Sequence, residues 1–152
     1  MLRSYFLIIL SIIFFTSCEY KPIYSAANKF NYDIVITEII GDKNLNKFLI
    51  ENLTKNSQTN SDKKIYVKIN TTYSKIILAK NAAGTVTNYQ SKATTTFIID
   101  KEQEDTTFTV EEKFDYQKMS DQYEEKNYEN NIKKNLATSI SQKLIFKLSI
   151  PQ

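Results

Sequence analysis

The side chains that most often carry catalysis or bind metal ions are scarce in this chain of 152 residues. It has no histidine, which excludes serine–histidine–aspartate and cysteine–histidine nucleophile systems as well as histidine-liganded zinc. Its one cysteine, Cys18, cannot form an intrachain disulfide, a CxxC redox pair or a cysteine-liganded zinc site. Only two glycines are present, so the sequence has no glycine-rich loop to hold a phosphate group.

Three clusters of acidic residues remain as candidates for acid–base chemistry or calcium binding. They lie at residues 102–105, 111–112 and 124–125. Their spacing matches no calcium loop, and lysines alternate with them along predicted turns and surfaces, as is typical of a solvated surface. We therefore expect the protein to be neither an enzyme nor a metal-binding protein, and we expect it to need no cofactor.

The charge of the chain is nearly balanced, with 20 basic and 17 acidic residues and a net charge of +3. Nucleic-acid-binding domains usually carry a larger excess of lysine and arginine, clustered on one face. We therefore expect no nucleic-acid partner. The composition favours a small binding or structural protein, and its most conspicuous feature is the position of the single cysteine.

Cys18 closes an apolar N-terminal segment. Arg3 provides a positive charge near the start, residues 5–15 are almost entirely apolar, and the small polar residues Thr16 and Ser17 precede the cysteine. The apolar run is too short to cross a bilayer comfortably, since a core of roughly 30 Å needs about 20 residues of helix. It has the length and composition of the hydrophobic region of a secretory signal peptide.

A signal sequence that ends in small residues directly before a cysteine resembles a bacterial lipoprotein signal. Such proteins are cut before the cysteine, whose sulfur carries diacylglycerol and whose new amine is usually acylated, and two or more acyl chains give stable anchoring. Cys18 is thus the expected lipidation site, residues 1–17 the cleaved signal peptide and residues 18–30 a lipidated tether. Phe15 departs from the leucine that is usual three residues before the cysteine. An ordinary cleaved signal with an incidental cysteine and an uncleaved anchor are the alternatives.

Hydrophobic periodicity divides residues 31–150 into strands and helices. Residues 31–40 are rich in β-branched side chains and nearly continuous in apolar character, which predicts a well-covered strand. Residues 42–56 place leucine and phenylalanine side chains at helical spacing, which predicts a helix. Asp42 or Asn44 can cap its first turn, because a short oxygen-bearing side chain accepts hydrogen bonds from the free amides there.

Residues 63–115 change to a period of two, which predicts three antiparallel strands. A turn at 81–84 joins the first two strands into a long hairpin, and a charged turn at 100–105 leads to the third. Residues from about 124 to 146 return to helical spacing, with an apolar residue every four positions. The expected order is β-α-β-β-β-α: an α+β two-layer sandwich in which two helices pack on a four-stranded mixed sheet.

Tyrosine and lysine side chains on the outer face of this sheet are candidates for binding, because both have an apolar body and a polar tip. Tyr66, Lys68 and Lys92 are placed there by the period of two. They could contact sugars, lipid phosphates or a protein wall. The alternative is that they are ordinary solvent-facing strand residues.

Several segments resemble the lipopolysaccharide (LPS)-assembly lipoprotein family LptE, especially its alphaproteobacterial branch. The opening Cys-Glu-Tyr-Lys-Pro-Ile-Tyr at 18–24 resembles that family's cysteine, aromatic and proline-aromatic start, although Glu19 stands where the family often has glycine. Residues 88–97 resemble its central strand, and residues 114–117 with the helix at 127–148 resemble its last strand and closing helix. The resemblance covers nearly the whole chain in order.

The resemblance implies that residues 31–150 form the LptE-like α+β domain and that the protein is a non-enzymatic plug. Family members sit inside the outer-membrane LPS-assembly β-barrel LptD, support its assembly, and bind lipopolysaccharide during delivery to the outer leaflet. In some members, binding involves a basic residue near the hairpin tip and another before the last helix, which meet the anionic phosphates of lipid A. By this comparison Lys80 and Lys126 are the expected lipopolysaccharide-binding residues, and Lys92 is a further candidate.

The implied location is the outer membrane, with a lipid anchor and the domain facing the periplasm. Glu19 agrees with this, because the aspartate associated with inner-membrane retention in some bacteria is absent from that position. A different class of function stays open, namely a generic periplasm-facing lipoprotein that serves another envelope complex or binds a small ligand. Both proteins would be lipid-anchored, so the identity of the partner distinguishes them.

Overall fold

The computed structural model describes residues 32–58, 61–100 and 105–150. The expected signal peptide, the tether and Cys18 lie outside the described residues. Within the described part, no helix is long and apolar enough to cross a membrane.

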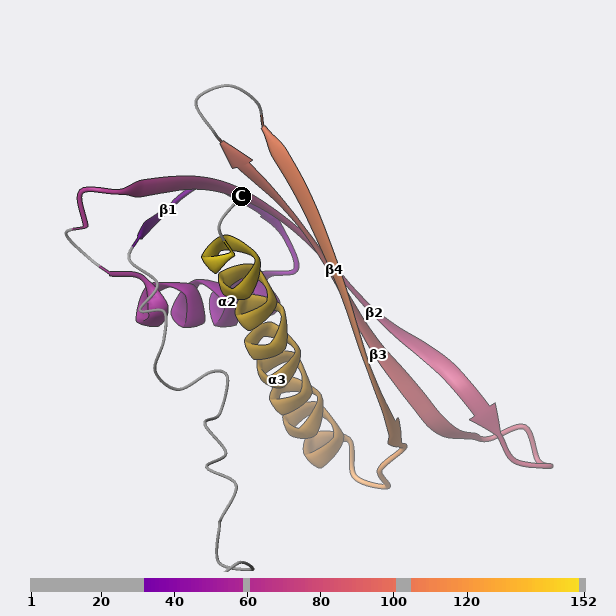
Figure 1. Cartoon of the computed structure of the whole chain (residues 1–152). Helices are drawn as coiled ribbons and strands as arrows, with labels where there is room; N and C mark the ends of the chain where they lie inside the picture. The colour runs from indigo at the N-terminus through magenta and orange to yellow at the C-terminus, as the bar shows by residue number, and fades with distance from the viewer. Residues whose placement is uncertain (1–31, 59–60, 101–104, 151–152) are drawn as a thin grey trace, which may run out of the picture.

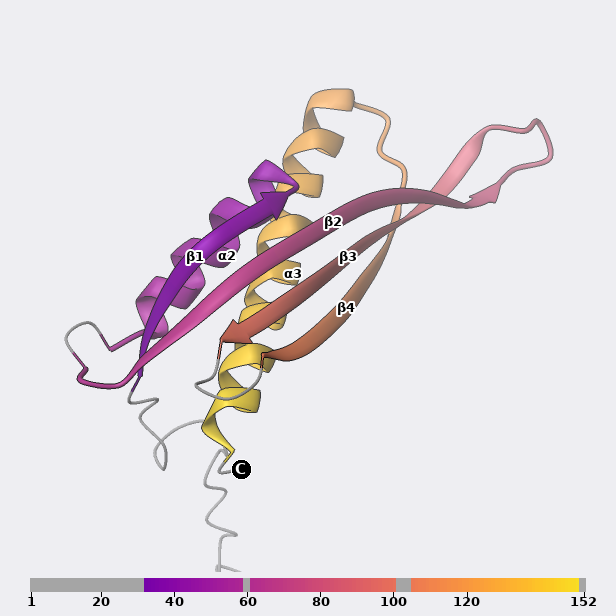
Figure 2. The ribbon, with the colours of Figure 1, turned by 90° about the horizontal axis from the view of Figure 1, so that it is seen from above.

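The described residues form an α+β sandwich of two layers (Figure 1). In chain order the elements are β1 (Asp33–Gly41), α2 (Lys43–Asn56), β2 (Lys64–Lys80), β3 (Val86–Asp100), β4 (Thr106–Gln117) and α3 (Gln122–Ser149). Both helices cover the same face of the sheet, as the two ribbon views agree (Figures 1 and 2). The predicted fold class and element order are confirmed.

The sheet is mixed and follows the order β1-β2-β3-β4. Strand β1 is parallel to β2, and α2 is the connection between them. Strands β2, β3 and β4 are antiparallel, as the predicted meander requires. The inner strands therefore form a long hairpin, and β1 and β4 lie at the two edges of the sheet.

The core lies between the helices and alternate residues of the strands. Along β3, the side chains at positions 91, 93, 95, 97 and 99 are all buried, while their neighbours remain partly exposed. The helices contribute leucine and isoleucine side chains with exposed fractions of 5% or less, namely Leu45, Leu49, Leu53, Ile132, Leu136, Ile140 and Leu144. Complete burial of one such side chain contributes about 1.5–3 kcal/mol, so this stripe is the main force that holds the helices on the sheet.

The structure corrects the prediction that the first strand is well covered. No residue of β1 is fully buried, and Ile40 is 51% exposed. The physical reason is that β1 is an edge strand, with a neighbour on one side only. Its β-branched composition therefore reflects strand propensity on a half-covered surface more than burial on both faces.

Two elements run further than their periodicity indicates. Strand β4 continues to Gln117, which brings Tyr116 into the core with 5% of its surface exposed. Helix α3 begins at Gln122, with Asp121 as its N-cap, and continues to Ser149. Capping explains the earlier start, since the Asp121 carboxylate accepts a hydrogen bond of 2.8 Å from the backbone N–H of Glu124.

Strand β1 is joined to α2 by a tight polar connection. Gly41 has a φ of +109°, a conformation that L side chains rarely adopt. Asp42 is the N-cap, and its carboxylate accepts a hydrogen bond of 2.8 Å from the Leu45 amide. The Thr71 hydroxyl of β2 accepts from the Asp42 amide at 3.1 Å and donates to the side-chain oxygen of the buried Asn46 at 2.6 Å. We call these residues the β1–α2 junction.

Replacement of Gly41 by alanine should destabilise the fold strongly. An added Cβ would lie 1.8 Å from the Thr71 carbonyl oxygen, in addition to the strain of the positive φ. We expect a loss of about 3 kcal/mol or more in the free energy of unfolding, measured by urea denaturation. Gly84→Ala is the matched control, because Gly84 has a φ of +77° but no atom within 4 Å of the added Cβ. It should cost only about 1–2 kcal/mol, and equal losses would show that the Thr71 contact is unimportant.

Candidate functional site at the hairpin arm

The β2–β3 hairpin extends beyond the rest of the sheet. The pairing of β1 with β2 ends at Gly41 opposite Thr71, whereas β2 continues and stays paired with β3. We call residues 72–94 the arm, because Thr72 pairs with Thr94 just past the end of β1. Figures 1 and 2 show the far part of the arm projecting past both helices. The arm is thus the part of the sheet with the least cover from the helix layer.

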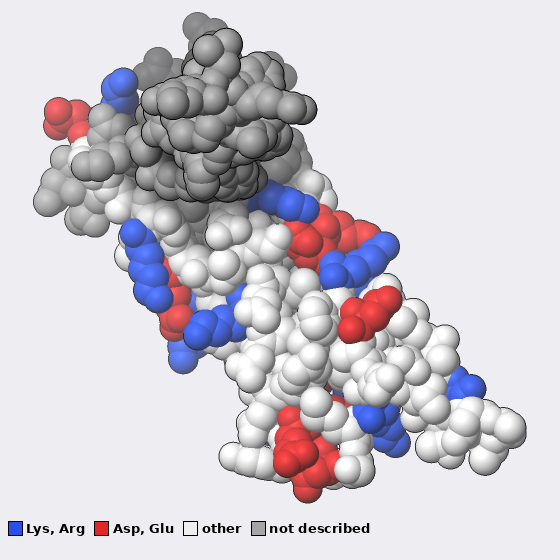
Figure 3. Space-filling model, turned by 60° about the horizontal axis from the view of Figure 1, so that its bottom comes forward, with Lys and Arg blue, Asp and Glu red and all other residues white. Residues whose placement is uncertain are grey.

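The far part of the arm exposes apolar side chains. Ile76, Ile77 and Leu78 are consecutive in β2 and are 41%, 50% and 47% exposed. Because neighbouring residues of a strand point to opposite faces, apolar surface is present on both faces of the arm. In Figure 3 the end of the arm, at lower right, is almost free of charged side chains. An exposed apolar surface of this kind is typical of a contact site for a protein or a lipid.

The base of the arm is attached to α3 through one lysine. The Lys75 ammonium lies 2.6 Å from a Glu125 carboxylate oxygen and 3.5 Å from a Glu129 oxygen. It also lies 4.1 Å from the centre of the Tyr89 ring and 5.6 Å from that of Tyr116, which are cation–π distances. We call these five residues the latch. They join β2, β3, β4 and the first turns of α3, and so fix the direction of the arm relative to the helices.

The latch holds its charges through specific contacts. Burial alone would lower the pKa of Lys75, but the hydrogen bonds to Glu125 and Tyr116 and the negative charge of Glu129 together outweigh it and hold the pKa of the ammonium above its usual range. The hydrogen bond from Lys75 lowers the pKa of Glu125. A second oxygen of Glu125 accepts a hydrogen bond of 3.1 Å from the Met119 amide, which also fixes the loop between β4 and α3. Both partners therefore stay charged at neutral pH.

Lys92, one of the predicted binding residues, lies on the outer face of the sheet in an ion pair. Its ammonium is 2.7 Å from a Glu111 oxygen, and Lys113 is 3.0 Å from the other oxygen of the same carboxylate. The hydrogen bonds from Lys92 and Lys113 lower the pKa of Glu111 to about 2. Lys92 is thus occupied within the protein, which weakens its candidacy for an anionic ligand.

Lys80 and Lys126 are both exposed, on different elements. Lys80 is the last residue of β2, opposite Val86 at the far end of the arm. Lys126 lies inside α3, in its second turn, because the helix begins at Gln122. The sequence-based placement of Lys126 before the helix is therefore wrong. The two views show the arm end and the start of α3 at the same end of the molecule (Figures 1 and 2).

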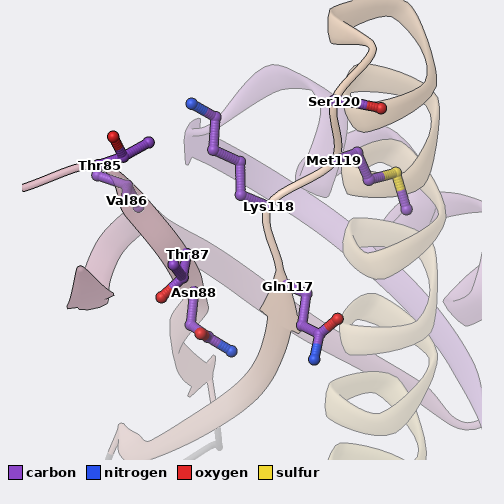
Figure 4. A pocket seen from close by; sticks show the side chains of 8 residues that line it. All are labelled: Thr85, Val86, Thr87, Asn88, Gln117, Lys118, Met119 and Ser120. Carbon is purple, nitrogen blue, oxygen red and sulfur yellow. The ribbon is translucent and has the colours of Figure 1, made fainter. Parts of the chain in front are cut away.

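Lys118 is the lysine that precedes α3, and the sequence reasoning missed it. Its backbone N–H donates a hydrogen bond of 2.8 Å to the Thr87 carbonyl, so the loop after β4 is paired with the start of β3. Residues 85–88 and 117–120 line a shallow groove of about 530 Å³ there. Figure 4 shows the Lys118 side chain extending to the side of the groove where Thr85 and Val86 lie. A cation among hydroxyl and amide groups is a suitable surface for an anionic, sugar-like group.

A charge pattern in the sequence could have pointed to the arm. The stretch from Lys63 to Ile99 contains six lysines and no aspartate or glutamate. The acids that neutralise Lys75 and Lys92 come from β4 and α3 instead. Lys80 is the one arm lysine for which the structure gives no ion pair within the described residues. Lys80 is therefore available to an external anion.

Within the described residues, no group of three or more acidic, histidine or cysteine residues is placed to hold a metal ion. The groove at the arm is lined by threonine, asparagine, glutamine, serine, methionine, valine and lysine, without a carboxylate. This surface is suited to contact and binding more than to acid–base chemistry.

Comparisons with known proteins identify similar structures but no similar sequence. No family model matches the chain, and no curated protein matches it significantly. Among solved structures, rare lipoprotein B from Shewanella oneidensis is 16% identical, with a TM-score of 0.54 over 76% of this chain and 94% of that one. A minor lipoprotein from Acinetobacter baumannii is 16% identical, with a TM-score of 0.52 over 78% and 94%.

A third neighbour was solved by NMR. Lipoprotein B from Nitrosomonas europaea is 11% identical, with a TM-score of 0.56 over 83% of this chain and 90% of that one. The chain shares the fold of these lipoproteins. At such low identity the likeness concerns the fold alone, and the function has to be argued from the site.

Replacement of Lys75 by methionine should loosen the arm. The change keeps the apolar stem but leaves Glu125 and Glu129 without their cation, and we expect a loss of about 1–2 kcal/mol. Hydrogen exchange at Tyr89 and its neighbours in the arm should accelerate. Lys92→Met is the matched control, because it removes an ion pair outside the latch, and its exchange rates should stay close to those of the unmodified protein.

The same variant should change how stability depends on pH. The folded-state pKa of Glu125 lies below its usual value of 4.5, so the unfolded chain binds more protons in the window between the two values. The latch therefore contributes fully above about pH 4.5, and its contribution is lost as the pH falls through the folded pKa. In Lys75→Met this part of the acid dependence should shrink in urea titrations at pH 3–6. An unchanged slope would contradict the role of Lys75.

Proposed function

We propose that this protein is an outer-membrane lipoprotein of the LptE type, which plugs and supports the LPS-assembly barrel LptD and helps deliver lipopolysaccharide to the outer leaflet. The observation that carries the proposal is the fold, which is the sandwich that the sequence resemblance implies and which solved lipoproteins share. The lipoprotein-like signal that ends at Cys18 supports a lipid anchor and a periplasm-facing domain. Assignment to the alphaproteobacterial branch rests on the motif at residues 18–24 alone.

The arm supports a role in contact with a large partner and an anionic lipid. Its exposed isoleucine and leucine side chains are suited to a protein or acyl surface, and Lys80 lies just beyond them. Lys118 adds a second cation beside the groove at the start of β3. Two ammonium groups at one end of the molecule are suited to the phosphates of lipid A, because charge-assisted hydrogen bonds are among the strongest in proteins. We propose that Lys80 and Lys118 bind them, with Lys126 further along α3.

The second candidate function is a generic periplasm-facing lipoprotein that serves another envelope complex or binds a small ligand. The groove of about 530 Å³ beside Lys118 favours it, since its few hydroxyl and amide groups, set among apolar surface, could hold a small anionic molecule. Both functions use the same anchor and the same end of the molecule. The partner that accompanies the protein in the envelope decides between them.

Purification from the native envelope tests the proposal directly. After gentle extraction in a mild detergent and mass spectrometry, the full chain should copurify with a large outer-membrane β-barrel in a stoichiometric complex. An obligate plug buries a large surface, so the complex should survive dilution. Recovery of the free monomer would contradict the plug. Copurification with a different complex would establish the second candidate.

Charge reversal tests the lipid-binding residues separately. Lys80→Glu with Lys118→Glu should weaken the binding of purified lipopolysaccharide by tenfold or more, because each replacement turns attraction to a phosphate into repulsion. Lys126→Glu tests whether Lys126 also contributes to lipopolysaccharide binding. Lys134→Glu is the matched control, since Lys134 is exposed on the same helix further from the arm. Equal affinity in all variants would remove the assignments without affecting the fold.

A further inference from the structure

One edge of β2 is open along the base and middle of the arm. Strand β1 pairs with β2 only as far as Thr71, while β2 and β3 stay in regular register from Tyr66 to Ile77. Within the described residues, β2 therefore has a strand on one side only from Thr72 to Ile77. Figure 2 shows β2 continuing past the end of β1. Alternate residues of such a stretch direct their N–H and C=O groups to the unpaired side.

The backbone on this stretch is accessible. Thr72, Ser74, Ile76 and Ile77 are all exposed. Lys75 is exposed as a residue although only 27% of its side chain is, so a large part of its accessible surface belongs to the main chain. No helix or loop of the described chain therefore covers the edge that β1 leaves free. At about 3.4 Å per residue the six residues span roughly 20 Å, the length of an ordinary strand.

This edge lacks the features that normally prevent strand addition. Edge strands are usually protected by proline, by charged side chains or by bulges. From Thr72 to Ile77 there is no proline and no acidic residue, and the one lysine, Lys75, is held in the latch. The first register shift in the arm comes only after Ile77. The edge strand β4, in contrast, carries Glu111, Lys113 and Asp115, and β1 has a register shift after Ile36.

The groups exposed at this edge indicate what kind of molecule can bind there. Unpaired backbone donors and acceptors in a row select an extended polypeptide. Ile76 and Ile77 lie on opposite faces, so the added strand needs apolar side chains on both of its faces. The arm carries lysines and no acid, and Lys80 has no acidic partner within the described residues. A second arm would bring only further lysines, whereas a strand with carboxylates complements the charge.

We propose that the open edge of β2 from Thr72 to Ile77 accepts an extended, apolar strand of a partner protein that carries an acidic residue for Lys80. The added strand takes the place beside β2 where β1 stops and covers Ile76 and Ile77. This docking surface goes beyond the proposed function, because it requires neither lipopolysaccharide binding nor a particular barrel. The test below uses a synthetic peptide and no envelope component. A negative result would therefore overturn strand docking on β2 without bearing on the proposal that the protein plugs a barrel.

The test uses the full chain in detergent and a synthetic peptide of alternating valine and isoleucine, apolar on both faces, with a glutamate at each end. Whether the peptide binds parallel or antiparallel to β2, one of its glutamates then lies at the end of the strand nearest Lys80. Addition of the peptide should slow hydrogen exchange at alternate amides of residues 72–77 by tenfold or more, as measured by NMR. A control peptide with alternate backbone nitrogens methylated cannot form the strand ladder and should give no protection. Equal protection by both peptides, or none at millimolar peptide, would overturn the proposal.

A pair of variants locates the site. Ile76→Lys should weaken peptide binding at least tenfold, because it replaces an apolar contact with a charged side chain that must lose water when the strand is covered. Tyr66→Lys is the matched control: Tyr66 lies on the same face of β2 and is 42% exposed against 41% for Ile76, but β1 covers its edge. Binding should be unchanged there, and equal loss in both variants would overturn the assignment. Sedimentation showing a dimer that Ile76→Lys disperses would assign the edge to a second copy and overturn the choice of partner.

Discussion

The contact between Gly41 and Thr71 is the constraint on which the rest of the structure depends. The chain leaves the sheet at Gly41, where the Thr71 carbonyl leaves no room for a side chain. The next residue, Asp42, caps α2, and its second carboxylate oxygen lies 3.1 Å from the Lys133 ammonium of α3. That ammonium in turn lies 4.0 Å from the centre of the Tyr73 ring, in the first residues of the arm. One junction therefore sets where β1 ends, where α2 begins, how α3 is attached and where β2 loses its parallel neighbour.

The arm owes its order to different interactions from those that hold the sandwich. In the sandwich, complete burial of leucine and isoleucine side chains dominates, and each contributes about 1.5–3 kcal/mol. The far arm buries little, and a two-stranded ribbon alone is marginal in water. The arm is held by the hydrogen-bonded ladder between β2 and β3, by the pairing of β3 with β4 as far as Asn88, and by Lys75 in the latch. The arm is thus a rigid extension only while its base stays attached to α3, and its exposed apolar surface gains stability from a partner rather than from the core.

Periodicity predicted the faces of the elements well and their surroundings poorly. A repeat of two or of four residues indicates which side of an element is buried, and Val67, Phe97 and Leu136, which follow these repeats, are indeed buried. Periodicity does not indicate how much of an element a neighbouring strand or helix covers. The edge position of β1 and the uncovered arm depend on where the chain leaves the sheet at Gly41, which is a matter of tertiary register. The run Ile76 to Leu78 did break the period of two, and this break was the local signal of an arm exposed on both faces.

Lys118 was missed for a related reason. The sequence placed the start of the last helix by its apolar stripe, but the helix begins at Gln122, before the stripe, because the Asp121 carboxylate caps it. Lys126 consequently lies within the helix, and Lys118 takes the position before it.

The distribution of acidic residues decides which lysines of the arm stay available to an external anion. Carboxylates of β4 and α3 neutralise Lys75 and Lys92 near the base of the arm, and the described chain places none at Lys80. A short screening length in physiological salt, about 8 Å, keeps those acids from cancelling the field at the arm end. The fold therefore neutralises the arm where it meets the protein and leaves it cationic where it meets its surroundings.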